Sequence, residues 1–109
     1  MKRYNPSMTT VASSNTLNVE GIFGASGRYF RFSRPLELQI ELDEEGLWHH
    51  RLPALNLWTY EPDRNDSLRG LQEFLDSNYE TFCLSDEQGL ESSALAYRKQ
   101  LLELISSVY

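Results

Sequence analysis

The sequence has few of the residues that crosslink small secreted proteins or cross membranes. It contains a single cysteine, Cys83, which excludes an internal disulfide and favours a reducing, cytoplasmic setting. No apolar run approaches the roughly 20 residues that a membrane helix needs, so we expect no membrane segment. Residues 1–16 begin with two basic residues but have no continuous apolar stretch, so we expect no secretory signal.

Positive charge is scarce beyond the first third of the chain. Residues 1–36 carry five bases and one acid, a net charge of +4, whereas residues 37–109 carry five bases and fifteen acids, a net charge of −10. The whole chain of 109 residues has a net charge of −6. A field of that sign disfavours general nucleic-acid binding and favours a basic partner.

One short string, RYFRFSR at residues 28–34, interleaves arginine with aromatic residues as nucleic-acid-binding strands do. The alternation of a strand sends Phe30 and Phe32 to one face and Tyr29 and Arg31 to the other. Because the aromatic rings do not share one face, we do not expect a base-stacking platform, and a nucleic-acid partner is disfavoured.

The length and the order of patterns predict one α+β domain over residues 15–109, preceded by a flexible tail at residues 1–14. Period-two alternation predicts a mainly antiparallel sheet of four to five strands, followed by two helices packed on one face. Pro35 is expected to interrupt the strands, and Gly46 to supply a left-handed hairpin residue. In the first strand the alternation places Leu17, Val19, Gly21 and Phe23 on one face and Asn18, Glu20 and Ile22 on the other. In residues 36–43 it places Leu36, Leu38, Ile40 and Leu42 on one face and Glu37, Gln39, Glu41 and Asp43 on the other, which is expected to be the wet face.

Helical spacing begins after EPDRND at residues 61–66. Asp66 is the expected N-cap of the first helix, since its carboxylate can accept hydrogen bonds from free backbone amides. Gly70 near the helix start indicates a close approach to the sheet, because glycine costs about 1 kcal/mol relative to alanine in a helix. A second helix is expected over residues 92–107.

The titratable residues do not converge on a reaction. His49 and His50 are neighbours on a strand, so they point to opposite faces and cannot share one metal ion. The acidic run Asp43–Glu45 is expected to be a solvated turn, and Cys83 a structural cysteine with acidic neighbours. We therefore predict no catalytic residue, no metal site and no cofactor, and a protein that is not an enzyme.

The aromatic residues indicate a binding surface instead. In LNLWTY at residues 55–60 the leucines suit the face beneath the helices, which leaves Trp58 and Tyr60 on the outer face, near Tyr29 and Arg31. Tyrosine, tryptophan and arginine are enriched at binding hot spots. These four residues, with Glu37 and Glu41 as charge complements, are the predicted partner-binding residues. For LWHHRL, the inner face is either Trp48, His50 and Leu52 or Leu47, His49 and Arg51.

The stretch PLELQIELDEEGLWHHRLPALNLWTY, followed after a short gap by DSLRGLQEFL, resembles the pattern of HicB-like antitoxins. That pattern consists of a strand, an acid-Gly turn, a strand, a P-x-L segment, another strand and a capped T-x-E-E-A-L helix. Asp66, Gly70 and Leu71 stand at the positions of its threonine, alanine and leucine. The tail from Leu84 is similar to that of short antitoxin-like proteins with one extra helix, so the resemblance covers about residues 35–107.

Two departures accompany this resemblance. EPDRND replaces the usual Gly-x-Thr turn before the helix, and the chain has no helix-turn-helix or ribbon-helix-helix segment for operator binding. The resemblance implies a non-enzymatic protein that binds and masks a small, basic, toxin-like partner. The alternatives are a homodimeric accessory protein whose aromatic face buries itself and, third, a degenerate nuclease.

Overall fold

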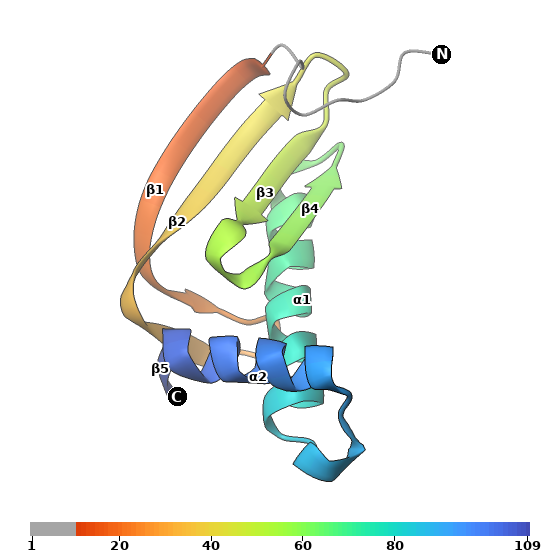
Figure 1. The fold of residues 1–109 in the computed structure, drawn as a ribbon. Helices are drawn as coiled ribbons and strands as arrows, with labels where there is room; N and C mark the ends of the chain where they lie inside the picture. The colour runs from red at the N-terminus through yellow and green to blue at the C-terminus, as the bar shows by residue number, and fades with distance from the viewer. Residues whose placement is uncertain (1–10) are drawn as a thin grey trace.

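The structure, a computed structural model, describes residues 11–109, which form one five-stranded antiparallel sheet and two α-helices (Figure 1). The predicted α+β class is confirmed. The elements in chain order are β1 (Val11–Phe23), β2 (Tyr29–Asp43), β3 (Trp48–Leu52), the 3-10 turn η1 (Pro53–Leu55), β4 (Leu57–Glu61), α1 (Arg64–Cys83), the 3-10 turn η2 (Glu87–Gly89), α2 (Ser92–Leu104) and β5 (Ile105–Val108).

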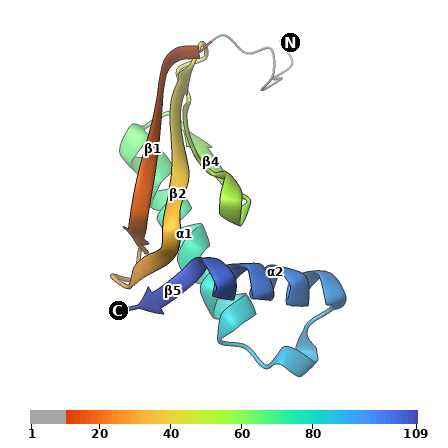
Figure 2. The ribbon, with the colours of Figure 1, turned by 60° about the vertical axis from the view of Figure 1, so that its left-hand side comes forward.

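The long strand β2 organises the sheet. β1 pairs with it along one side, while its other side is shared by β3, opposite Gln39–Leu42, and by β5, opposite Phe30–Phe32. β4 adds to β3, so the order is β1-β2-β3-β4 with β5 beside the other half of β2. The two ends of β2 therefore have different neighbours, with the β3–β4 hairpin at one end and β5 and α2 at the other, while α1 runs behind the sheet from the hairpin towards α2 (Figures 1 and 2).

Pro35 does not split this strand, which corrects the predicted interruption. The pairing with β1 passes from Val19 opposite Leu36 to Gly21 opposite Arg31, so residues 32–35 have no paired residue in β1. Proline has no N–H to donate to a ladder, and it is tolerated where the ladder is broken.

The same irregularity reverses the faces of β1 near its end. Ile22 is buried and Phe23 is 60% exposed, although simple alternation predicts the opposite. A register shift between Val19 and Gly21 moves every following side chain to the other face. The start of β1 also corrects the predicted tail, because residues 11–14 belong to the strand; residues 1–10 lie outside the described part of the chain.

The inner face of the sheet carries the core. Phe30, Phe32, Leu36, Leu38 and Ile40 are all buried, which confirms the alternation predicted for β2. Further core residues come from the β3–β4 region, from both helices and from β5: Leu52, Leu55, Leu57, Leu71, Leu75, Leu101 and Ile105. None of the helices within residues 11–109 is long and apolar enough to cross a membrane.

The two helices have different ends from those predicted. Asp63, not Asp66, is the N-cap of α1, and its carboxylate accepts the backbone N–H of Asp66 at 3.0 Å. Asp66 lies in the first turn, where a negative charge complements the helix dipole. α2 ends at Leu104 rather than residue 107, because Ile105–Val108 pair with the part of β2 that β3 leaves free.

Candidate protein-interaction surface

The β3–β4 hairpin places His49 and His50 on opposite faces of the sheet, as predicted. His50 lies on the inner face with Leu52 and the half-buried Trp48, which selects one of the two arrangements left open by the sequence. In register, His49 stands opposite Tyr60, and Arg51 stands opposite Trp58. These four side chains form the outer face of the hairpin.

A chain of hydrogen bonds connects Asp43, His49 and Trp58 on this outer face. The Asp43 Oδ2 atom is 2.7 Å from His49 Nε2, and the indole N–H of Trp58 donates to His49 Nδ1 at 3.0 Å. Asp43 Oδ1 also accepts the backbone N–H groups of Glu45 and Leu47. Asp43 is only 4% exposed, which corrects the prediction of a fully solvated turn, whereas Glu44 and Glu45 are exposed.

This geometry defines the tautomer of His49. An indole N–H can only donate, so Nδ1 of His49 is the acceptor and the ring proton is on Nε2, where it points to Asp43. Burial by itself raises the pKa of Asp43, but the hydrogen bonds from His49 and from the backbone of Leu47 and Glu45 outweigh it. The net pKa of Asp43 is below its ordinary value, so the carboxylate is ionised at neutral pH.

The buried ring of His49 supports two exposed rings. Its centroid is 5.8 Å from that of Trp58 and 5.6 Å from that of Tyr60, both in stacked orientation. The Cζ atom of Arg51 lies over the Trp58 ring, 4.9 Å from its centroid. Arg51 also forms an ion pair with Glu41, in which Nη1 is 3.5 Å from Oε2. We call these five residues, Glu41, His49, Arg51, Trp58 and Tyr60, the outer aromatic surface. Trp58 is 41% and Tyr60 56% exposed, although His49 beneath them is buried.

The other predicted partner-binding residues do not join this surface. Glu37 is exposed on β2, four residues before Glu41 on the same face. Tyr29 and Arg31 lie at the opposite end of β2, where Arg31 pairs with Ser107 of β5. The expectation that Tyr29 and Arg31 are near Trp58 and Tyr60 is therefore wrong, because β2 is a single long strand.

Tyr29 belongs to a second aromatic cluster. Its ring is 4.8 Å from that of Phe23 and 6.3 Å from that of Tyr109, and both of these neighbours are largely exposed. Hydrogen bonds from Ser107 and Arg31 lower the pKa of Tyr109. Of the six predicted residues, Glu41, Trp58 and Tyr60 thus belong to the outer aromatic surface, Tyr29 and Arg31 lie at the other end of β2, and Glu37 joins neither group.

On the inner face, His50 connects the sheet to α1. Its Nδ1 atom is 2.8 Å from the hydroxyl of Ser67, and the Thr59 hydroxyl donates to the Ser67 carbonyl at 2.7 Å. All three residues are buried. Burial, together with the positive charge of Arg64 and the neighbouring His49, lowers the pKa of His50. This network holds the first turns of α1 on β3 and β4.

Neither histidine is arranged for acid–base chemistry. Both ring nitrogens of His49 are engaged by protein groups, and its ring is 2% exposed. The pair of His50 and Ser67 has the distance of a base and a nucleophile, but Ser67 is 0% exposed beneath α1. Burial also raises the pKa of the half-buried Cys83 thiol, although Arg98 opposes this effect.

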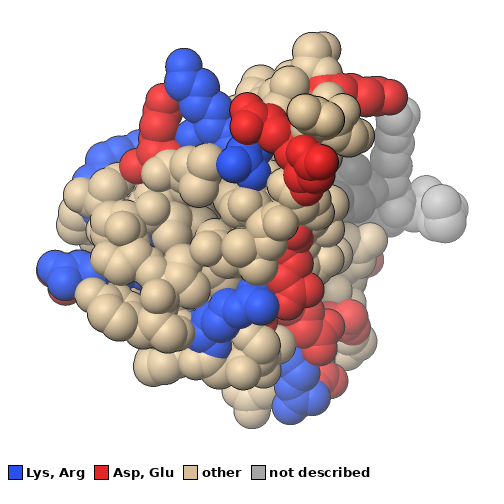
Figure 3. All heavy atoms as spheres, turned by 90° about the horizontal axis from the view of Figure 1, so that it is seen from below, with Lys and Arg blue, Asp and Glu red and all other residues tan. Residues whose placement is uncertain are grey.

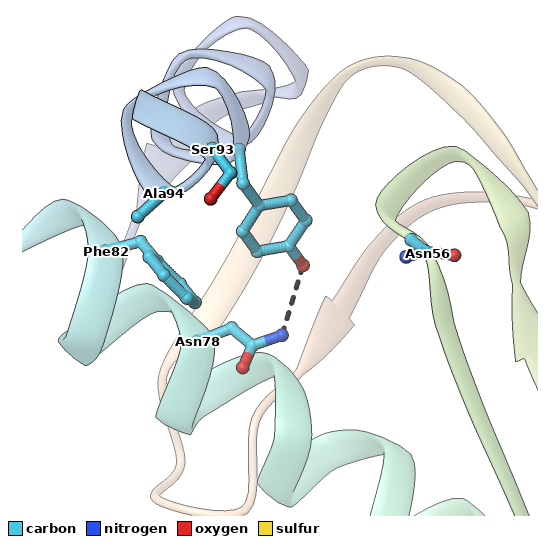
Figure 4. Close-up of a pocket in the computed structure, with 6 residues that line it drawn as sticks. Asn56, Asn78, Phe82, Ser93 and Ala94 are labelled. Carbon is cyan, nitrogen blue, oxygen red and sulfur yellow. Dashed lines mark hydrogen bonds between the residues drawn. The ribbon is translucent and has the colours of Figure 1, made fainter. Parts of the chain in front are cut away.

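A hollow of about 400 Å³ lies between the helices and the residue that follows η1 (Figure 4). Tyr97 of α2 reaches across it, where its hydroxyl donates to the Leu55 carbonyl at 2.8 Å and accepts the side-chain amide of Asn78 at 3.1 Å. Burial raises the pKa of Tyr97. The hydrogen bonds of Tyr97 therefore tie α2 to η1 and to α1.

The surface charge is unevenly distributed. Seen from the end of the molecule at which α2 lies, acidic side chains gather in a band along one side, and most of the basic side chains lie elsewhere (Figure 3). Some basic side chains adjoin this band, and a broad uncharged area lies beside it. A partner that approaches this end therefore meets regions of opposite sign.

Comparison with known proteins adds no relative, since no family model, curated protein or solved structure matches the chain. The resemblance of residues 35–107 to HicB-like antitoxins therefore stays a prediction from the sequence. The order β2, turn, β3, η1, β4 and α1 agrees with the order of elements in that pattern, which concerns the architecture only.

Proposed function

We propose that this protein is a non-enzymatic binding module that holds a basic protein partner on its outer aromatic surface. The observation that carries the proposal is the exposed pair Trp58 and Tyr60, supported from beneath by a buried histidine that Asp43 and Trp58 hold in one orientation. Rings that are already fixed lose little side-chain entropy when a partner binds, so they can contribute strongly to affinity.

Charge supports the choice of a basic partner. Residues 37–109, which include the outer aromatic surface and both helices, carry fifteen acids against five bases. Such an excess accelerates association with a positively charged protein and makes the rate depend on salt. An association rate that is the same at low and high salt would count against this part of the proposal.

The mode of action that we propose is masking by stoichiometric binding. The toxin-like character of the partner rests on the resemblance to HicB-like antitoxins, and a cytoplasmic location rests on the single cysteine. Among residues 11–109, the two histidine networks contain no exposed nucleophile or base. Binding therefore explains the arrangement better than turnover does.

The experiment is capture from native lysate with the tagged full chain, followed by identification of the retained proteins. We expect one small basic protein with the wild type, and its loss with Trp58→Ala/Tyr60→Ala, because truncating two hot-spot rings removes most of the contact. Phe23→Ala/Tyr109→Ala is the matched control, since it removes two exposed rings from the second aromatic cluster. Equal loss with both variants, or no loss with either, would contradict the proposal.

A second candidate function, self-association into a homodimer, is favoured by β1. Among the described residues no strand pairs with the outer edge of β1, and residues 11–19 of this edge strand carry no charge. Exposed edge strands usually carry charges or prolines that prevent pairing with another chain. A stable dimer of the purified protein, lost on Thr16→Lys, would support this candidate.

A further inference from the structure

The edge of the sheet formed by β4 borders a groove of about 350 Å³. Among residues 11–109, β4 pairs with β3 on one side and with no strand on the other. In Figure 1 no strand lies beyond β4, and α1 passes behind it. Four consecutive residues of the strand and three of the helix line the groove: Trp58, Thr59, Tyr60, Glu61, Gly70, Glu73 and Phe74.

The lining residues show how the groove runs. Trp58 and Tyr60 point to the outer face of the sheet, whereas the buried Thr59 points to the inner face. Consecutive residues from both faces can line one groove only if it follows the backbone edge between them. The groove is therefore placed where the next strand of the sheet would lie.

One face of α1 forms the inner wall of the groove. Gly70, Glu73 and Phe74 are three and four residues apart, so they share one helical face. A Cβ atom on Gly70 would be 3.3 Å from Thr59 Cγ2, which shows how closely α1 approaches β4 and confirms the predicted role of this glycine. Phe74 is 50% exposed beyond the strand. An added strand would cover this ring and pack on a helix that is already in place.

The charge of the groove is of one sign. Glu61 and Glu73 are both exposed, and they are the only charged residues that line it. An acidic strip beside an open strand edge attracts lysine or arginine and repels acidic segments. The long aliphatic stems of such side chains can cover Phe74 while their charged ends reach the two carboxylates.

We propose that the open edge of β4 binds an extended segment of the basic partner as an additional strand, with its Lys or Arg side chains on the α1 side and apolar side chains beside Trp58 and Tyr60. This inference rests on the proposed function, which it deepens by giving the backbone geometry and the sequence character of the bound segment. Backbone hydrogen bonds supply affinity in this mode, and alternate side chains supply specificity.

The first test uses a fluorescent eight-residue peptide that alternates valine and lysine. We expect saturable binding to the full chain and protection from hydrogen exchange of those backbone amides of residues 57–61 that point away from β3. Alternate residues of a strand point their amides to the same edge, so N-methylation of one alternate set should abolish binding and methylation of the other set should not. A peptide that alternates valine and glutamate should not bind.

The second test uses charge reversal in the protein. Glu73→Lys should weaken binding of the valine–lysine peptide by about tenfold, because it replaces an attraction with a repulsion beside the bound segment. Glu87→Lys makes the same change in η2, away from the groove, and should leave binding within about twofold of the wild type under the same screening. The inference would be overturned if Glu73→Lys and Glu87→Lys weakened peptide binding equally. It would also be overturned if N-methylation of the two alternate sets of peptide amides had the same effect on binding.

Failure of this inference can be distinguished from failure of the proposed function. If Trp58→Ala/Tyr60→Ala abolishes capture of the partner while Glu73→Lys does not change it, the partner binds the outer aromatic surface without strand addition. If wild-type protein forms a dimer that Glu73→Lys dissociates, a second copy occupies the edge, and the inference is likewise overturned.

Discussion

His49 and His50 occupy consecutive positions in β3, and both side chains are at most 2% exposed. His49 is held between Asp43 and Trp58 on the outer face, where it supports two exposed rings. His50 contacts Ser67 on the inner face, where it attaches α1 to the sheet. The comparison teaches that similar burial serves different purposes here: one network shapes a surface, and the other joins two layers of the fold.

The largest stability effect is expected when the outer network is broken at its carboxylate. In Asp43→Asn the remaining oxygen can still accept the amides of Glu45 and Leu47, but the new NH₂ group faces the Nε2 proton of His49. Moving that proton to Nδ1 would oppose the indole N–H of Trp58. One buried donor is left without an acceptor, so we expect a loss of about 2 kcal/mol in the free energy of unfolding.

Urea unfolding at neutral pH measures this loss, and Trp58 fluorescence reports the change around the ring. Glu45→Gln is the matched control, because it removes an exposed carboxylate from the same turn. A variant at Asp43 that is as stable as this control would show that the outer network contributes little.

A smaller effect distinguishes the two networks by pH. Burial lowers the pKa of His50 below its ordinary value of 6.5, so protonation favours the unfolded chain and stability falls as the pH decreases through about 6.5. The pKa of Asp43 is lowered from 3.8, so the stability that it contributes is complete above that value and is lost only in stronger acid. The two contributions therefore disappear in separate pH windows.

Thermal unfolding between pH 8 and pH 3 tests this separation. The difference between wild type and His50→Asn should change mainly between pH 7 and pH 5, and the difference between wild type and Asp43→Asn mainly below pH 4. A difference curve for His50→Asn that is flat across the upper window would contradict the assignment.

Much of the fold follows from alternation in the sequence. Leu36, Leu38 and Ile40 are buried as predicted, and Gly46 has the expected positive φ of 82°. The exceptions arise where a long-range pairing overrides a local pattern. Pro35 lies in a break of the ladder, and Ile105 leaves its predicted helix to pair with β2. The shift in the β1–β2 pairing near Pro35 and the pairing of Ile105 with β2 both depend on residues far apart in the sequence, so neither has a local signal.

The candidate site was predicted in part. Alternation places Trp58 and Tyr60 on the outer face, but the support beneath them depends on the hairpin register that brings His49 beside Trp58 and close to Asp43. A turn of acidic residues usually indicates solvent exposure, so the burial of Asp43 becomes visible only when the histidine is placed. Alternation alone predicts Tyr29 on the same surface, because periodicity defines a face and not a position along a strand.

The most direct test of the account compares the two histidines by their effect on binding. The dissociation constant of the captured partner is measured with wild type, His49→Ala and His50→Asn, at a temperature where all three are folded. We predict that His49→Ala weakens binding by about tenfold, because Trp58 and Tyr60 lose the ring on which they stack. We predict that His50→Asn changes the dissociation constant by less than about twofold. Equal weakening by both variants, or a larger effect of His50→Asn, would contradict the claim that the outer network exists to present Trp58 and Tyr60.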